Sequence, residues 1–152
     1  MATVTGGDKL EAYLRKMASR VGRPATLKVG ILAGASYPDG TPVAMVAAVN
    51  EFGRPSIGQP PRPAFRNTVA KKGGEWPDAL ASALKASDYD ATTALNLMGE
   101  GVAGQIREEI STLTSPPIKP ETARRKGSTK PLVEKGIELG SIDYEIVPGA
   151  SA

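Results

Sequence analysis

The 152-residue chain contains no cysteine and no histidine. Without cysteine it cannot form disulfide bonds or use thiolate chemistry. Without histidine it lacks the side chain that most often serves as a general base near neutral pH and as a metal ligand. Zinc sites and nucleophile systems of the Ser-His-Asp or Cys-His kind are therefore excluded.

Aromatic side chains and long apolar runs are also scarce. Four tyrosines, two phenylalanines and one tryptophan are too few for a single-strand nucleic-acid binder built on stacking platforms. The longest apolar run, Val43 to Val49, covers seven residues, whereas a membrane-spanning helix needs about 20. The opening residues, MATVTGGDKL, lack the apolar core of a signal peptide. We therefore expect a protein that is made and used in a cytoplasm-like environment, without a membrane anchor.

Proline and glycine are abundant, with 13 and 17 residues, which predicts long ordered loops or mobile arms. A hydrophobic content of 40% supports a folded protein, and a net charge of +3 makes it only mildly basic. The length predicts a single domain over 1–152. We expect flexible termini at about 1–7 and 148–152, and a loop or arm at about 114–131.

Apolar spacings of three and four residues predict several helices. A first helix follows the candidate N-cap Asp8 and ends at Gly22 and Pro24; its apolar face is Leu10, Leu14, Met17 and Val21. A second follows Thr41-Pro42, an N-cap with proline at the first helical position, and stops at Gly53.

Three further helices are expected in the middle of the chain. One starts at Pro63, with Phe65 and Val69 facing inward, and ends near Gly73-Gly74. Another is indicated by Trp76, Leu80 and Leu84. The longest opens at Asp88 and is ended by Pro116-Pro117; its apolar face is Leu95, Met98, Val102, Ile106, Ile110 and Leu113.

Two segments alternate between apolar and polar residues, as half-buried strands do. Leu27, Val29 and Ile31 share one side of the first, and Ile142, Tyr144 and Ile146 share one side of the second. We expect these distant segments in one small antiparallel sheet packed by several helices, which is an α+β fold with proline-rich loops or an extended arm.

Gly99, Gly101 and Gly104 spell GxGxxG, but the pattern lies within a predicted helix and lacks the preceding strand of a dinucleotide site. We interpret it as a helix face trimmed for close packing, against a symmetry-related subunit for example. The acidic residues give no convincing catalytic pair: Glu108 and Glu109 fit a solvated helix face. The prediction is a protein that is not an enzyme and has no cofactor and no metal site.

Charge is unevenly spread. Residues 54–72 carry five basic and no acidic side chains, 119–130 carry five basic and one acidic, and 131–152 carry four acidic and one basic. Three interpretations stay open: ordinary surface solubility, contact with phosphate or an acidic partner, and pairing of the basic arm of one copy with the acidic strand of another. The basic arm consists of Lys119, Arg124, Arg125, Lys126 and Lys130.

The stretch VNEFGRPSIGQPPRPAFR, from Val49 to Arg66, is the most unusual in the chain. Phe52 and Gly53 fit a helix end at which the glycine is left-handed and the phenylalanine folds back on the core. The prolines that follow fix a stiff segment that loses little entropy on docking. We expect Arg62 and Arg66 to project from it, as suits a permanent protein interface.

AAVNEFG followed by PPRPAFR resembles a signature of the tail-completion, neck or minor tail proteins of long-tailed double-stranded DNA bacteriophages. The closing block PPIKPETARRKGSTKPLVEKGIELGSIDYEIV is also similar, and the resemblance covers about Val43 to Val147. Its matches in this block are Pro117, Pro120, Thr122, Lys126, Pro131, Leu132, Gly136, Leu139, Ser141 and Ile142. The family usually has an Asp-Thr-Gly-like turn after Pro-Leu, where this chain has Glu134-Lys135-Gly136.

The resemblance implies a structural virion protein, found in the tail or neck and in the host cytoplasm during assembly. It would form a homo-oligomeric ring, with six-fold symmetry expected, at the head-proximal end of the tail. The ring would be joined to other tail and head–tail connector proteins, with transient contact to packaged DNA in the channel. The candidate interface residues are Asn50, Glu51, Phe52, Gly53, Pro61, Arg62, Pro63, Phe65, Arg66, Pro117, Pro120, Thr122, Pro131 and Leu132.

Two alternatives remain at this point. A tail terminator, which caps the tail tube, shares the expected architecture. A small cytoplasmic DNA-binding protein would instead use Arg62, Arg66, Arg124, Arg125 and Lys126 on phosphates, with an affinity that falls steeply with salt.

Overall fold

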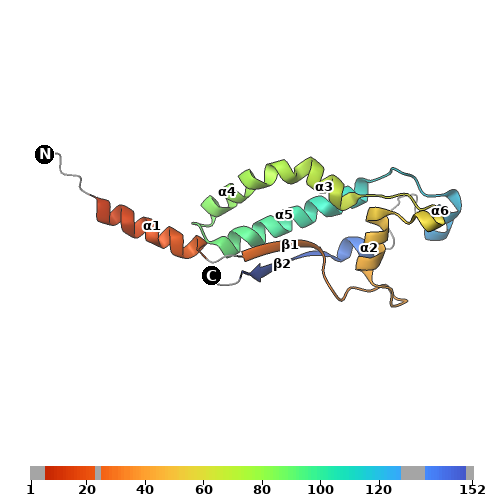
Figure 1. Cartoon of the computed structure of the whole chain (residues 1–152), viewed down its shortest axis with the longest axis horizontal. Coiled ribbons are helices and arrows are strands. Elements are labelled where there is room, and N and C mark those ends of the chain that lie inside the picture. Colours follow the sequence, from red (N-terminus) through yellow and green to blue (C-terminus); the bar gives the residue numbers. More distant parts are fainter. Residues whose placement is uncertain (1–5, 23–24, 128–135, 150–152) are drawn as a thin grey trace.

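The structure is a computed structural model that describes residues 6–22, 25–127 and 136–149. The molecule is elongated (Figure 1). Helix α1 (Gly7–Val21) projects at one end, and α2 (Val43–Phe52) and α6 (Pro120–Lys126) lie at the other. Between them, the long helix α5 (Ala91–Thr112) lies between a small sheet and the helices α3 (Ala64–Lys72) and α4 (Trp76–Ala86).

The sheet confirms the predicted α+β fold. Strands β1 (Ala25–Ile31) and β2 (Ile142–Pro148) pair antiparallel, and Val29 lies opposite Tyr144 in the register. The outward residues Asp143 and Glu145 are exposed, as their alternation predicts, and Ile142 is buried. The segments form a sheet because their apolar sides can be covered together by α5, which contacts both strands.

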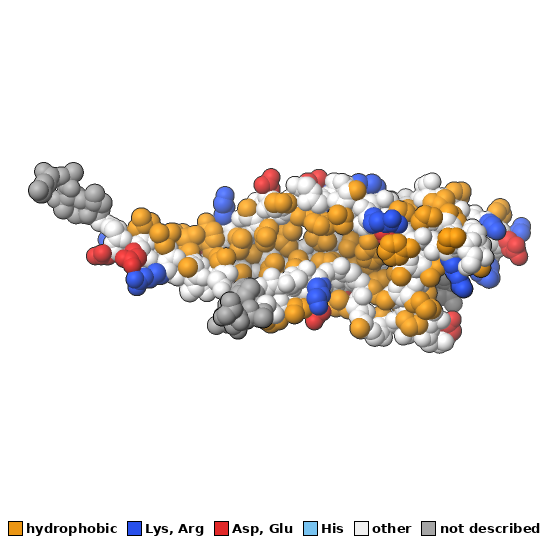
Figure 2. All heavy atoms as spheres, viewed as in Figure 1, with side chains coloured by type: hydrophobic (Ala, Val, Ile, Leu, Met, Phe, Trp, Pro, Cys, Tyr) orange, Lys and Arg blue, Asp and Glu red, His pale blue; other side chains and the backbone are white. Residues whose placement is uncertain are grey.

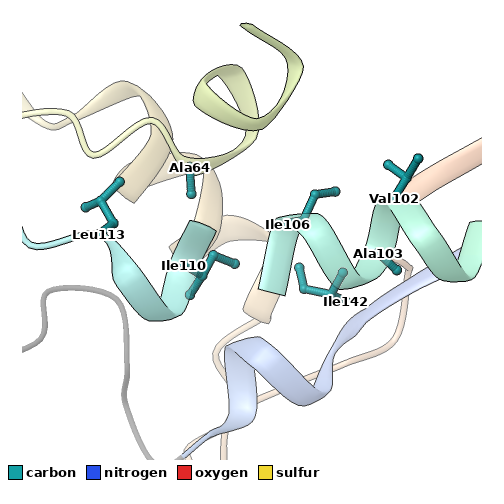
Figure 3. Packing of buried hydrophobic residues seen from close by; sticks show 7 residues of the cluster. All are labelled: Ala64, Val102, Ala103, Ile106, Ile110, Leu113 and Ile142. Atoms are coloured by element: carbon teal, nitrogen blue, oxygen red, sulfur yellow. The ribbon is translucent and has the colours of Figure 1, made fainter. Parts of the chain in front are cut away.

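Helix α5 supplies most of the core (Figure 3). Its N-cap is Asp90, whose carboxylate accepts a hydrogen bond from the Thr93 amide at 2.7 Å, so the helix begins two residues after the predicted Asp88. This bond holds the pKa of the Asp90 carboxyl below its ordinary value. The buried cluster consists of Ala64, Val102, Ala103, Ile106, Ile110, Leu113 and Ile142.

Only one of the three GxGxxG glycines faces a neighbour in the described part of the chain. A Cβ atom at Gly99 would clash with the ring of Tyr144 on β2, so this glycine brings α5 and the sheet together. A Cβ atom at Gly101 or Gly104 would meet no described atom within 4 Å. The close-packing interpretation therefore holds within the chain for Gly99, whereas Gly101 and Gly104 are exposed.

Two predictions about the shorter helices were wrong in detail. Helix α2 has Pro42 as its N-cap and not as its first residue. In α3, Val69 is exposed, and the inward positions are Ala64 and Thr68, with Phe65 half-buried. The buried side of α3 differs from the predicted one because Ala64 packs into the α5 core cluster.

Short helical segments complete the fold: the 3₁₀ turns Pro55–Ile57 and Gly73–Glu75, and α7 (Ile137–Gly140).

Both terminal segments that were expected to be flexible include residues of regular secondary structure. Gly7 is the first residue of α1, and Pro148 lies opposite Ala25 in the sheet. The rest of the predicted terminal segments, apart from Gly6 and Gly149, lies outside the described residues.

Candidate interaction surface

Glu51 joins α2 to α3. Its side chain is 8% exposed. Its carboxylate accepts hydrogen bonds from the backbone amides of Phe65 and Arg66, at 3.1 and 3.0 Å, and from Nε of Arg66 at 3.0 Å. Because Pro63, the N-cap residue of α3, has no side-chain acceptor, a carboxylate from another helix occupies this place and complements the helix dipole.

The proline-rich loop between these helices is pinned at both ends. Gly53 has φ 75° and ψ 175°, so its φ is positive as predicted but it is not in the left-handed helical region. A side chain there would meet the backbone of Gln59 and Pro61. The amide of Arg62 donates to the carbonyl of Asn50 at 2.7 Å. The loop is therefore stiff, as expected, because it packs on the end of α2.

Arg62 is buried, with 6% exposure, so the expectation that it projects into solvent was wrong. Its Nε donates to the carbonyl oxygen of Pro116 at 2.9 Å, and Nη2 to that of Pro117 at 3.2 Å. Burial lowers the pKa of the Arg62 guanidinium, which still stays charged near neutral pH. Arg62 thus anchors the start of the predicted arm to the α2–α3 loop.

The predicted arm over 114–131 is partly helical, because α6 occupies Pro120–Lys126. Its basic side chains Lys119, Arg124 and Arg125 are exposed. A cleft of ≈ 460 Å³ separates this segment from the loop that contains Gln59. It is lined by Asn50, Ile57, Gly58, Gln59, Pro60, Arg62, Pro117, Ile118, Lys119, Thr122 and Arg125. The predicted residues Lys130, Pro131 and Leu132 lie outside the described residues, as does the side chain of Lys126.

The sequence predicted that Phe52 folds back on the core. This prediction was wrong, because Phe52 is 68% exposed. The guanidinium of Arg66 lies over its ring, 5.2 Å from the centroid. Met45 and Ile57 are also exposed near this end of the molecule. An apolar hollow of ≈ 230 Å³ beside Phe52 is lined mainly by residues of α2. Exposed apolar groups next to a cation are typical of a protein-binding surface.

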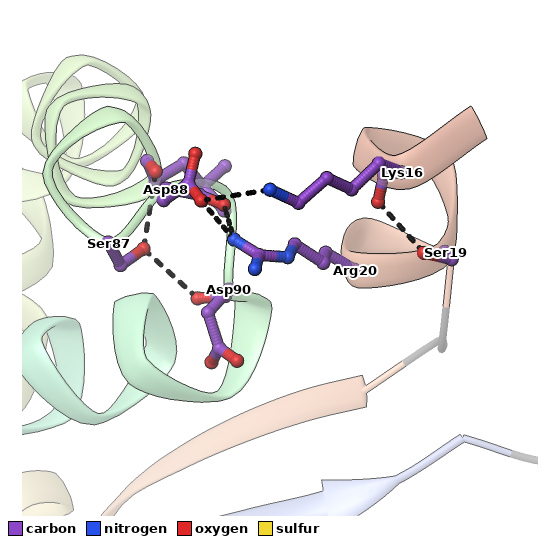
Figure 4. Close-up of polar contacts among 7 residues, drawn as sticks. Lys16, Ser19, Arg20, Ser87, Asp88 and Asp90 are labelled. Carbon is purple, nitrogen blue, oxygen red and sulfur yellow. Dashed lines mark hydrogen bonds and ion pairs between the residues drawn. The ribbon is translucent and has the colours of Figure 1, made fainter. Parts of the chain in front are cut away.

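Helix α1 is attached to the body by polar contacts (Figure 4). Arg20 forms an ion pair with the carboxylate of Asp88 and donates to its carbonyl at 2.8 Å, and Lys16 lies 3.9 Å from the same carboxylate. None of the fifteen described residues of α1 is buried. The sequence predicted this helix and its apolar face, but not that most of the face would be exposed; of its four residues only Met17 is half-buried.

The acidic residues of α5 do not all lie on a solvated face. Glu108 is exposed, as expected. Glu109 is not, because its side chain is 12% exposed and accepts hydrogen bonds from Lys71 at 2.7 and 2.8 Å and from Asn67 at 3.1 Å. Among the described residues, no group of three or more acidic side chains is placed to hold a metal ion. Nor does any described helix have the length and apolar character to cross a membrane.

No protein-family model matches the chain, and neither curated proteins nor solved structures give a match. The site is therefore defined by its own geometry. That geometry brings Asn50 and Glu51 together with Arg62, Phe65 and Arg66, and links Arg62 to Pro117. Gly53 lies against the backbone of Gln59 and Pro61 in the same loop.

Proposed function

We propose that the chain is a structural subunit of a tailed bacteriophage particle, which assembles with copies of itself into a ring at the head-proximal end of the tail. The proposed role involves no catalysis, cofactor or metal. One observation carries it: large apolar side chains lie on the surface of the lone subunit, including most of the apolar face of α1. Figure 2 shows hydrophobic side chains of all sizes spread along the visible face. The large apolar residues that are exposed are Leu10, Tyr13, Leu14, Val21, Met45, Phe52, Ile57, Val69 and Leu97.

These side chains group at separate places. One group lies on α1, and another, with Phe52 and Met45, lies at the opposite end of the elongated subunit. A ring subunit at a junction needs two kinds of contact, with its own copies and with adjoining components. Repeated contacts between two different surfaces form a closed ring when the rotation that relates one copy to the next divides a full turn evenly. Two distant apolar surfaces support such a subunit better than a protein that acts alone.

The phage assignment is supported by the resemblance of AAVNEFG and PPRPAFR to tail-completion and neck proteins. Three residues of these two segments fix the loop between α2 and α3 in place. Glu51 caps α3, Gly53 allows the loop to pack on α2, and Arg62 anchors the segment after α5. A surface held this firmly binds a partner with little loss of conformational entropy.

The proposal is tested with the purified full-length protein and with purified particles. Native mass spectrometry and electron microscopy should show rings, and the chain should be present in particles with assembled tails. A protein that stays monomeric at high concentration and is absent from purified particles would contradict the proposal.

The DNA-binding alternative loses one of its five candidate residues, because Nε and Nη2 of the buried Arg62 guanidinium donate to backbone carbonyl oxygens. A gel shift with duplex DNA at two salt concentrations separates the two functions. A phosphate-binding protein would lose affinity steeply as salt rises. Weak, salt-insensitive binding is the result expected for the ring subunit.

A further inference from the structure

The apolar face of α1 has the geometry of a helix–helix contact. Leu10, Leu14, Met17 and Val21 follow one another at spacings of four, three and four residues, which is the spacing of a coiled-coil seam. Leu10 and Leu14 are 59% and 53% exposed. A helix of fifteen residues is marginal in water unless a partner covers its apolar face. The uncovered face therefore needs an occupant.

A second stripe with the same spacing runs along the outer side of α5. Its residues are Leu97, Gly101, Gly104 and Glu108, all of which are exposed. Leu97 is 54% exposed, although it is a large apolar residue in the middle of a helix. We define these four residues as the α5 outer stripe.

The two stripes are complementary in size. Each rises by about 16 Å from its first residue to its last, at 1.5 Å per residue. The α1 stripe consists of large side chains, whereas the centre of the α5 outer stripe consists of Gly101 and Gly104, above which the described chain leaves open space. Large side chains of one helix can therefore seat against the bare backbone of the other, as in packing that alternates large and small residues.

The stripes are also complementary in charge. Helix α1 carries four basic side chains against two acidic ones, a net charge of +2. Arg15 pairs with Glu11, and Lys16 and Arg20 contact Asp88 of the same chain, so Lys9 is the basic residue of α1 that takes part in none of the described ion pairs. The α5 outer stripe ends in Glu108 and is bordered by the exposed Glu100. A basic helix against an acidic one is favoured in encounter and in register.

A subunit does not cover its own α5 outer stripe with its own α1. In Figure 1, α1 extends away from the body beyond the N-terminal end of α5. Its contact with Asp88 lies close to that end. The occupant that fits the size, spacing and charge of the α5 outer stripe is consequently the α1 of another copy.

We propose that α1 of one subunit docks along the α5 outer stripe of a neighbouring subunit, and that this contact repeats around the ring. Donor and acceptor surfaces differ, so each copy gives one helix and receives one, as a closed ring requires. This inference rests on the proposed function and adds to it the pair of surfaces that meet between copies.

The absence of natural cysteines allows a direct test by disulfide formation. Two full-length single variants, Leu14→Cys and Gly104→Cys, are mixed under mild oxidation at a concentration at which the wild type assembles. Because a disulfide forms only between cysteines held within about 7 Å, docking should produce a mixed dimer. Its yield should exceed that of a control mixture of Leu14→Cys and Glu145→Cys by about tenfold or more. Mass tags on one variant identify mixed dimers.

Other products of this experiment overturn the inference. A Leu14→Cys homodimer as the main product would mean that α1 pairs with another α1. A yield at the level of the control would mean that α1 docks elsewhere. A double variant that cross-links within one chain at low concentration would mean that α1 covers its own α5.

A second variant pair tests the contact without cross-linking. Gly104→Leu fills the space that α1 should occupy, and ring formation should weaken by about tenfold or more. Gly74→Leu is the matched control, since Gly74 is exposed and also has open space around it. Normal assembly of Gly104→Leu would overturn the inference. Wild-type rings with no α1–α5 cross-link would overturn it while leaving the proposed function intact, whereas absence of rings and of virion incorporation would overturn both.

Discussion

Gly99 of α5 lies against the ring of Tyr144 on β2. Its missing side chain leaves room for the ring of Tyr144, whose hydroxyl donates to the Asn96 side chain at 3.1 Å. A single methyl group here would push the helix away from β2, whereas at Gly101 or Gly104 it would meet no described atom. We therefore expect substitutions at Gly99 and at Gly101 to change the free energy of unfolding in opposite directions.

We predict that Gly99→Ala lowers the free energy of unfolding by about 1–3 kcal/mol, because the added Cβ atom overpacks the Tyr144 contact. Gly101→Ala should instead raise it by up to about 1 kcal/mol, since alanine favours the helix. Denaturant unfolding of the two variants measures the difference. Equal effects at both positions would show that Tyr144 does not pack on Gly99.

Glu51 is the second residue on which local structure depends. We predict that Glu51→Gln lowers the free energy of unfolding by about 2 kcal/mol, because one carboxylate oxygen that accepts hydrogen bonds becomes an amide donor facing other donors. Thermal unfolding checks this, with Glu100→Gln on the exposed side of α5 as the control. An effect no larger than that of the control would show that the amides of Phe65 and Arg66 have other acceptors.

At the scale of elements, Arg62 connects two segments that are distant in sequence. Without its bonds to the carbonyls of Pro116 and Pro117, the following segment should detach more often from the body. We predict that Arg62→Met raises the rate of trypsin cleavage after Arg124 and Arg125 by about tenfold or more, since cleavage of α6 needs local opening. Limited proteolysis followed by mass spectrometry measures this rate.

The matched control for this experiment is Arg54→Met, which removes an exposed arginine from the same loop. It should leave cleavage in α6 unchanged. If Arg62→Met is cleaved no faster than the control, α6 is held in place by other contacts.

Sequence periodicity predicted the elements well where one face of an element is buried. The three- and four-residue spacing of α5 found the core residues Val102, Ile106 and Ile110, because they face both the sheet and the helices. The alternation in β2 correctly placed Asp143 and Glu145 outward for the same reason.

Periodicity failed where an element is short or where its role depends on a distant partner. Val69 fits the apolar pattern of α3, but a pattern over nine residues is compatible with several rotations of the helix about its axis. The packing of Ala64 into the core cluster determines which side of α3 is buried. Nothing in the local sequence shows that Glu51 caps a helix fourteen residues later or that Arg62 bonds Pro116. Pairings of that kind follow from the tertiary fold.

For the whole molecule, the distribution of apolar surface predicts that assembly and folding are separable. Because no described residue of α1 is buried, removing residues 1–22 should change the melting temperature of the body by only a few degrees. The same truncation should abolish ring formation. Calorimetry and native mass spectrometry on one preparation measure both quantities.

A large loss of thermal stability in the truncated protein would contradict this prediction, since it would mean that α1 stabilises the body from which it projects. Replacing Arg20 by Met in the full-length chain serves as a milder comparison, because it removes the Arg20 contacts with Asp88 and leaves Lys16 beside the same carboxylate.

The two bonds of Arg62 also have a mechanical consequence. A pull on the segment after Pro117 is transmitted through the guanidinium into the loop beside α3, as well as along the covalent chain from α5. Tension applied by a neighbour at α6 would therefore be shared between two routes into the body. The Arg62 bonds therefore make this end of the elongated molecule stiffer against shear than the covalent chain alone would.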